Sequence, residues 1–194
     1  MQRRAAMKSA TPIRKESDII KVKKYLAGNK RDLFFFVLGI NTGIRAGDLL
    51  KLRVKDLKYT VVGDQIPIIE EKTGKQNYII INKPVYKTFQ EYLREYDPAD
   101  NDYIFFSRKG NRQENHLHIF SMSRIVKQWF QDLNMPGNWG CHSMRKTWGY
   151  QQRVKYGVDW SIICRRYNHS NPAITMRYLG ITSDEVSQIC MNEI

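Results

Sequence analysis

The sequence predicts a mainly α-helical (α+β) fold: a helical bundle with a small antiparallel β-sheet at one edge. Apolar residues recur at helical spacing through most of the chain, whereas β-branched runs are concentrated between residues 60 and 81. The segment Lys72-Thr-Gly-Lys75 separates two of those runs and is typical of a hairpin turn. With 194 residues, 42% of them hydrophobic, the chain is long enough to bury one core.

The helices are predicted from apolar periodicity and from the residues that stop it. Ile19, Val22 and Leu26 share one helical face, and Gly28 ends that helix. Gly43 closes the apolar run 33–40 that forms the next helix. In chain order, the expected helices cover residues 17–28, 32–43, 48–52, 84–97, 119–129, 143–156 and 160–164, followed by one that Pro172 opens.

Strands are expected where β-branched residues cluster between turn residues. The runs 66–70 and 78–81 form the hairpin, and two further short strands are expected at 60–62 and 103–106. The domain organisation expected is a basic flexible arm (1–16), one folded domain (17–181) and a C-terminal tail helix (182–194). That tail is too short to be a stable helix by itself, so it requires a surface on which to pack.

Positive charge dominates the chain and is unevenly distributed. The formal net charge is +13, and residues 1–31, with ten Lys and Arg and two acidic residues, carry +8 of it. A charge this asymmetric indicates a polyanionic partner, most commonly nucleic acid. The alternatives are a solvated basic arm and an anionic membrane surface, although the arm offers no Trp- or Phe-rich face for insertion.

Several protein classes are excluded by composition. The longest apolar stretch, 33–40, is far shorter than the roughly 20 residues of a membrane span, and no apolar segment follows the basic N-terminus as in a secretory signal. The cysteines, Cys141, Cys164 and Cys190, are odd in number and contain no Cys-x-x-Cys pair. A disulfide framework or zinc ribbon is therefore not expected, and the reducing cytoplasm is the predicted location.

Two features in the first half of the chain suit an anion site. Arg45 follows a helix-ending glycine at the start of a new helix, and Asp48 lies at i+3, close enough to orient the guanidinium. Lys72 stands at the tip of the hairpin, from which it can reach into a groove. On spacing alone, a surface Arg–Asp pair and a solvent-facing lysine are the better explanations.

Two more features lie in the second half. His142 and Arg145 are at i and i+3, so on a helix they share a face and suit a phosphate that needs both a proton acceptor and a bidentate cation. His169 precedes a Pro-opened helix, and Tyr178 follows nine residues later. From spacing alone, each of these residues is equally compatible with a structural role.

The motifs that the sequence lacks narrow the chemistry further. There is no G-x-x-x-x-G-K-[ST] loop, no acidic cluster with two-metal spacing and no Cys/His set with zinc spacing. The inventory of Arg, Lys, His and Tyr predicts a phosphoryl-transfer site that uses neither a metal nor a cofactor.

Taken in order, the four features resemble the catalytic domain of tyrosine recombinases, the phage integrase family, from about residue 17 to residue 179. TGIRAGDLLKL resembles the first arginine box, EKTGKQNYIII the hairpin lysine segment, CHSMRKTWG the His-x-x-Arg box and NHSNPAITMRYLGI the closing box. The sequence departs from the usual pattern at Asp48, where Glu is common, and at Asn168, where Gly is common. The catalytic residues that the resemblance implies are Arg45, Lys72, His142, Arg145, His169 and the nucleophile Tyr178.

The resemblance implies an integrase-like fold and site-specific cleavage and rejoining of double-stranded DNA through a 3′-phosphotyrosyl intermediate, without metal or ATP. His142 takes the Tyr178 proton, Lys72 protonates the leaving oxygen, and the remaining three residues offset charge on the phosphate. Lys75 is the rival of Lys72 for the general-acid role.

Two other functions remain open: a non-catalytic DNA-binding protein of the same fold, and a relaxing enzyme like type IB topoisomerases. The resemblance also implies a DNA-dependent homo-oligomer that assembles through the tail from residue 182 to residue 194, whose apolar residues are Val186, Ile189 and Met191. Packing of the tail on its own domain is the alternative.

Overall fold

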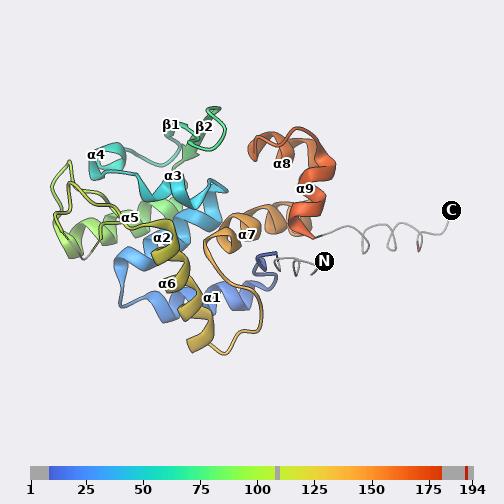
Figure 1. Cartoon of the computed structure of the whole chain (residues 1–194), viewed down its shortest axis with the longest axis horizontal. Coiled ribbons are helices and arrows are strands. Elements are labelled where there is room, and N and C mark those ends of the chain that lie inside the picture. Colours follow the sequence, from blue (N-terminus) through green and yellow to red (C-terminus); the bar gives the residue numbers. More distant parts are fainter. Residues whose placement is uncertain (1–8, 108–109, 181–190, 192–194) are drawn as a thin grey trace, which may run out of the picture.

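The computed structural model describes residues 9–107, 110–180 and 191. These residues form nine helices and one two-stranded antiparallel sheet, so the predicted fold class is confirmed (Figure 1). The elements are α1 (Glu16–Leu26), α2 (Lys30–Thr42), α3 (Ala46–Leu50), α4 (Val54–Leu57), β1 (Gln65–Ile69), β2 (Gln76–Ile80), α5 (Lys83–Tyr96), α6 (Ile119–Asp132), α7 (Cys141–Val154), α8 (Trp160–Arg166) and α9 (Pro172–Leu179).

Helix α2 is the centre of the main core. The Asn29 side chain caps its first turn by accepting a hydrogen bond from the Asp32 amide, and Gly43 ends it in the left-handed conformation (φ 65°). Phe34, Phe35 and Phe36 are all completely buried, since α5 packs on one side of the helix and α7 on another. This packing holds the end of α2 against α7, which brings the first arginine box to the His-x-x-Arg box.

The predicted hairpin is present at the edge of the helical body. Strand β1 pairs with β2 in antiparallel register, with Ile66 opposite Ile79, and the turn between the strands contains Lys72 (Figure 1). Ile79 is buried and Ile81, just beyond β2, is also buried, so the inner face of the hairpin is fixed to the main core. The turn therefore projects from an anchored base.

Two predicted strands are wrong, and one helix was not predicted. Residues 60–62 lie in a turn in which the Asp64 carboxylate accepts the Val61 amide, because Val61 and Val62 are exposed. Residues 103–106 make only two isolated bridges, Arg53 with Tyr103 and Phe106 with His116. The short helix α4 went unrecognised because four residues are too few to show a period.

A second, smaller core positions the C-terminal helices. It contains Trp160, Ile163, Tyr167 and Leu179, which join α8 and α9 to each other and to α7. Gly149 in α7 lies against the Tyr167 ring, and a larger residue there would collide with it. Helix α9, which carries Tyr178, is therefore held directly against the helix that carries Arg145.

The described part of the predicted arm belongs to the folded domain. The Ile13 amide donates to the Thr147 hydroxyl in α7, the Thr11 amide donates to the Asn138 carbonyl, and Ile13 is buried. From Ser9 onward the chain is thus packed where the sequence predicted a flexible segment. Residues 1–8 and all of the tail except Met191 lie outside the described residues. No helix in the described ranges has the length and apolar character needed to cross a bilayer.

Candidate active site

Arg45 is held at the start of α3 by a carboxylate that sequence reasoning did not identify. Its guanidinium forms an ion pair with Glu70, the residue that follows β1. The prediction that Asp48 orients Arg45 is corrected, since one Asp48 oxygen instead accepts the Glu71 amide at 3.1 Å and ties α3 to the hairpin. The first arginine box and the hairpin are therefore fastened together at two adjacent points.

Glu70 is completely buried, and each of its carboxylate oxygens is engaged. Oε2 accepts the Thr73 hydroxyl at 2.8 Å and pairs with Arg45, while Oε1 accepts the Asn77 amide at 3.0 Å and lies 3.9 Å from Arg145 Nη1. Burial by itself raises the pKa of this carboxyl, but hydrogen bonds from Asn168, Thr73, Asn77 and Arg45 outweigh burial and lower the pKa to about 2. Glu70 is therefore a fixed negative charge at neutral pH.

Arg145 is buried in α7, and its guanidinium is anchored by backbone groups. Nη1 donates to the Gly43 carbonyl at 2.7 Å, and Nη2 donates to the Tyr167 carbonyl at 2.9 Å. The guanidinium also lies over the Tyr167 ring, 4.4 Å from its centroid. These contacts fix the group in one orientation and leave its other N–H donors available for an anion.

His142 lies in the first turn of α7, one turn before Arg145, and its side chain is exposed. Desolvation within the site lowers the pKa of His142, and the positive charges of Arg145, Lys72 and Arg45 lower it further. The imidazole is therefore neutral near pH 7 and able to accept a proton. Lys72 acts on His142 from the hairpin turn, so of the two candidate lysines it is the one with a described interaction in the site.

His169 and Tyr178 meet between α8 and α9. Their ring centroids are 5.6 Å apart in an edge-to-face arrangement, and His169 Nδ1 lies 2.9 Å from the Thr175 hydroxyl. Burial and the charges of Arg145 and Arg45 lower the pKa of His169 to about 4. His169 is consequently a neutral hydrogen-bonding group at pH 7.

The Tyr178 hydroxyl is buried, and among the described residues no side chain makes a hydrogen bond of good geometry with it. Burial raises the pKa of this hydroxyl, and the nearby Arg145 and Arg45 offset part of the rise. Lys146 Nζ lies 4.9 Å from the centroid of the Tyr178 ring. A tyrosine with an unpartnered hydroxyl beside two guanidinium groups is suited to act on an anionic electrophile.

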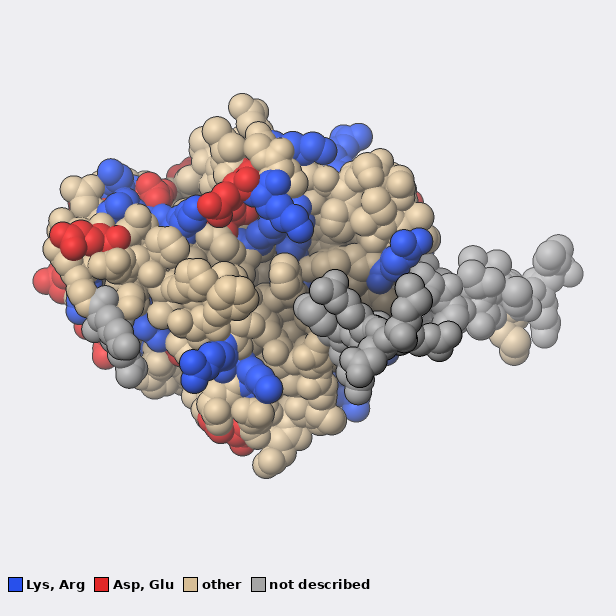
Figure 2. Space-filling model, viewed as in Figure 1, with Lys and Arg blue, Asp and Glu red and all other residues tan. Residues whose placement is uncertain are grey.

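Tyr178, His142 and Lys146 also line a surface hollow of about 480 Å³. Phe120, at the start of α6, lines the same hollow and is 74% exposed. Figure 2 shows basic side chains gathered on the molecular face beneath the hairpin, beside a smaller acidic group. Tyr178 and His142 therefore border a common hollow, whereas the Arg45 and Arg145 side chains are largely covered.

The structure brings all six predicted residues into one electrostatic cluster, although they come from five separate segments. The residues that sequence reasoning missed are supporting groups, chiefly Glu70, Asn77 and Arg166. For Glu70 a signal existed: strand alternation places it on the same face as Ile66 and Ile68, and a buried carboxylate requires a cation. The Arg166 guanidinium donates to the Thr42 carbonyl and to Asn77 Oδ1, so it faces inward.

Comparison with known proteins shows what kind of site this is. The sequence pattern of the phage integrase family matches residues 14–185. The chain belongs to the phage integrase family. Among its relatives, the probable integrase/recombinase YoeC of Bacillus subtilis (strain 168) is 36% identical over 176 residues, which cover 89% of this chain and 91% of that protein. The resemblance to tyrosine recombinases is thereby confirmed.

More distant family members are longer. The tyrosine recombinase XerC of Caldanaerobacter subterraneus subsp. tengcongensis is 24% identical over 164 residues, which cover 82% of this chain but 44% of XerC. The crystal structure of XerA recombinase aligns with 96% of this chain and 66% of its own, at a TM-score of 0.74 and 18% identity. A post-cleavage complex of XerH with difH DNA aligns with 98% of this chain and 55% of its own, at a TM-score of 0.74 and 16% identity. The fold is that of tyrosine recombinase catalytic domains.

Proposed function

We propose that the chain is a tyrosine-type site-specific recombinase that cleaves and rejoins double-stranded DNA through a 3′-phosphotyrosyl intermediate. The observation that supports this proposal best is the position of the Tyr178 hydroxyl, which is buried beside Arg145 and His169 and has no hydrogen bond of good geometry to any residue that the structure describes. A protein that only binds DNA has no use for a tyrosine hydroxyl at the centre of a cationic cluster.

The proposed cleavage step is an in-line displacement at phosphorus. The Tyr178 oxygen forms a bond to phosphorus while the bond to the 5′ oxygen breaks, and the hydroxyl proton passes to the neutral imidazole of His142. Lys72 at the hairpin tip gives a proton to the departing 5′ oxygen. Rejoining reverses each of these transfers with the 5′-hydroxyl of another strand.

Arg45, Arg145 and His169 are proposed to stabilise the charge that develops on the non-bridging oxygens. Both arginines are held by protein groups behind them, so little reorganisation is needed when the phosphate reacts. Because the phosphotyrosyl bond conserves the energy of the broken phosphodiester, rejoining needs no nucleotide cofactor. Since we propose DNA as the substrate, and the relative YoeC comes from a bacterium, whose chromosome lies in the cytoplasm, we infer that the enzyme works there.

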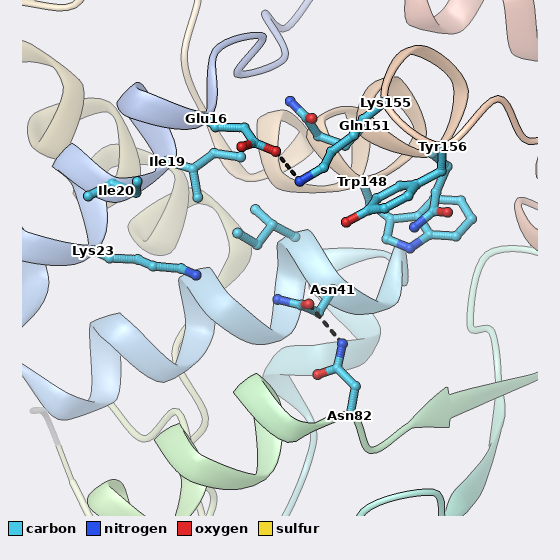
Figure 3. Close-up of a pocket in the computed structure, with 12 residues that line it drawn as sticks. Glu16, Ile19, Ile20, Lys23, Asn41, Asn82, Trp148, Gln151, Lys155 and Tyr156 are labelled. Atoms are coloured by element: carbon cyan, nitrogen blue, oxygen red, sulfur yellow. Dashed lines mark hydrogen bonds and ion pairs between the residues drawn. The ribbon is translucent and has the colours of Figure 1, made fainter.

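We further propose that the tail from residue 182 to residue 194 docks on a second copy of the chain when both are bound to DNA. A hollow of about 470 Å³ between α1, α2 and α7 suits such a segment, because Ile19, Ile20 and Ile40 line it and Lys23 stands beside them (Figure 3). The tail combines apolar Val186, Ile189 and Met191 with acidic Asp184, Glu185 and Glu193. Deletion of residues 183–194 is expected to leave one protomer bound per site in sedimentation, and unchanged assembly on DNA would contradict this docking.

Covalent trapping tests the proposed reaction. Labelled, nicked suicide fragments from the DNA flanking the gene are incubated in EDTA with the wild type or with Tyr178→Phe, and then separated on a denaturing gel. A shifted, protease-sensitive band with the wild type alone supports the mechanism, whereas absence of any band with the wild type overturns it. Relaxation of a plasmid by single protomers, without recombination between two sites, would favour the topoisomerase alternative.

A further inference from the structure

Glu70 occupies an unusual place in the cluster that the proposed reaction uses. It is the carboxylate that contacts Arg45, it lies 3.9 Å from Arg145, and its side chain has no exposed surface. The Arg45 side chain, by contrast, is 17% exposed. A phosphate arriving from solvent can therefore reach Arg45 but cannot reach Glu70, which lies behind the guanidinium.

The Glu70 carboxylate offsets the repulsion between two arginines of the site. Arg45 and Arg145 carry like charges and both act on groups of the same small site, so in a partly dehydrated environment they repel each other. A buried anion between them offsets that repulsion, and its other donors, among them Thr73 and Asn77, prevent it from turning toward the phosphate. The position of the Glu70 carboxylate is thus fixed by its own hydrogen bonds, and the carboxylate in turn fixes Arg45.

We propose that Glu70 is a positioning residue for the strand-cleavage reaction, fixing Arg45 at the place where the scissile phosphate binds. This inference rests on the proposed function, since it assigns Glu70 a role in that reaction. Arg45 has a long side chain and stands at the N-cap of the five-residue helix α3. Its side chain makes no hydrogen bond to the first turn of that helix, so the orientation of its guanidinium depends on Glu70 behind it.

A competing explanation is that Glu70 only shapes the turn that carries Lys72. Its backbone supports that turn, because the Glu70 amide donates to the Lys75 carbonyl and the Glu70 carbonyl accepts the Gly74 amide at 2.8 Å. The two explanations predict different chemical defects. A misplaced Arg45 weakens stabilisation of the non-bridging oxygens, whereas a misplaced Lys72 weakens protonation of the leaving oxygen.

The experiment measures single-turnover formation of the covalent complex on a fragment that the wild type cleaves. Each fragment is made with a normal phosphodiester and with sulfur in place of the 5′ leaving oxygen. A thiolate leaves without prior protonation, since a thiol pKa is about 8.5, so sulfur bypasses a missing general acid. The variants are Glu70→Gln, Glu70→Asp, Thr73→Val and Lys72→Met, with Glu71→Gln as the matched control, because Glu71 is an adjacent exposed glutamate paired with Lys51.

We expect Glu70→Gln to slow cleavage about 100-fold or more on both fragments, with DNA affinity unchanged, and Lys72→Met to recover on the sulfur fragment. Glu70→Asp, which keeps the charge on a shorter side chain, should lower the cleavage rate about 10-fold. Thr73→Val should lower the cleavage rate by less, and the sulfur fragment should not restore it. Circular dichroism separates these effects from unfolding, and Thr73→Val keeps the test decisive if Glu70→Gln does not fold.

Recovery of the Glu70 variants on the sulfur fragment, or wild-type rates in them, would overturn the positioning role. A wild type that forms no covalent complex with any fragment would instead overturn the proposed function itself.

Discussion

The Thr175 hydroxyl lies 2.9 Å from His169 Nδ1, which joins the middle of α9 to the residue just beyond α8. Thr175 is completely buried, so the imidazole is held by a partner that solvent does not replace. A bond at Nδ1 fixes which ring nitrogen faces the site, and it leaves the other nitrogen for the phosphate in the reaction that we propose.

Replacing Thr175 by Val tests that relationship, because the substitution keeps the shape and removes the hydroxyl. We expect the rate of covalent-complex formation to fall on the order of 10-fold, with little change in DNA affinity. The comparison variant is Ser170→Ala, an exposed hydroxyl next to His169. Equal rates in wild type and Thr175→Val would mean that Thr175 does not orient the imidazole.

The pKa of His142 should depend on the hairpin lysine. Lys72 is among the charges that lower this pKa, so Lys72→Met should raise it and move the imidazole's protonation to higher pH. Lys75→Met is the control and should produce a smaller shift. Titration of the His142 ring signals by NMR measures both changes without any DNA, and a larger shift with Lys75→Met would favour Lys75 as the lysine of the site.

Glu70 should contribute to stability in a pH-dependent way. Its pKa is lowered from 4.5 to about 2 in the folded chain, so its contribution is full above pH 4.5 and is lost as pH falls toward 2. The shift corresponds to about 3 kcal/mol, which sets the order of the loss in Glu70→Gln at pH 7. Urea unfolding between pH 7 and pH 3 should show that the difference in free energy of unfolding between wild type and variant becomes smaller at acid pH. A difference that stays constant with pH would show that the charge of the carboxylate does not stabilise the fold.

Gly149 should tolerate no side chain. An added Cβ would collide with the Tyr167 hydroxyl, so Gly149→Ala is expected to destabilise the domain by about 1–3 kcal/mol. Gly47→Ala is the matched control, since Gly47 also lies in a helix but has open space around its Cα. Thermal unfolding followed by circular dichroism compares them, and equal melting temperatures would mean that α7 and Tyr167 separate at little cost.

Local pattern was sufficient to predict most of the secondary structure. Apolar spacing located α1 and α6 because each buries one face. A continuous apolar run located α2, which is buried on nearly all sides, and the turn residues located the hairpin. The same reasoning failed at 60–62, since β-branched composition does not reveal whether a partner strand is present. A strand depends on its neighbour, whereas a helix closes its hydrogen bonds within itself.

The residues that belong to a sequence motif could be predicted, whereas the residues that contact those motifs only in the folded chain could not. The six residues of the four boxes were predicted from their resemblance to the family's motifs in the same order, and the folded chain brings them close together. Glu70 escaped notice because its role depends on Arg45, 25 positions earlier in sequence. Arg166 likewise belongs to none of the four boxes, and only the folded chain shows that it is directed inward to Thr42.

Arg166 and Thr42 are separated by 124 residues in sequence, and Arg145 reaches the Gly43 carbonyl across 102. A chain still emerging from the ribosome therefore has Arg45 long before it has the helices that hold the opposite side of the cluster. Tyr178 is synthesised later still. Half-made molecules consequently lack the helices that hold Arg45 and Arg145 together and the tyrosine that we propose as nucleophile, so the proposed site is complete only when synthesis is nearly finished.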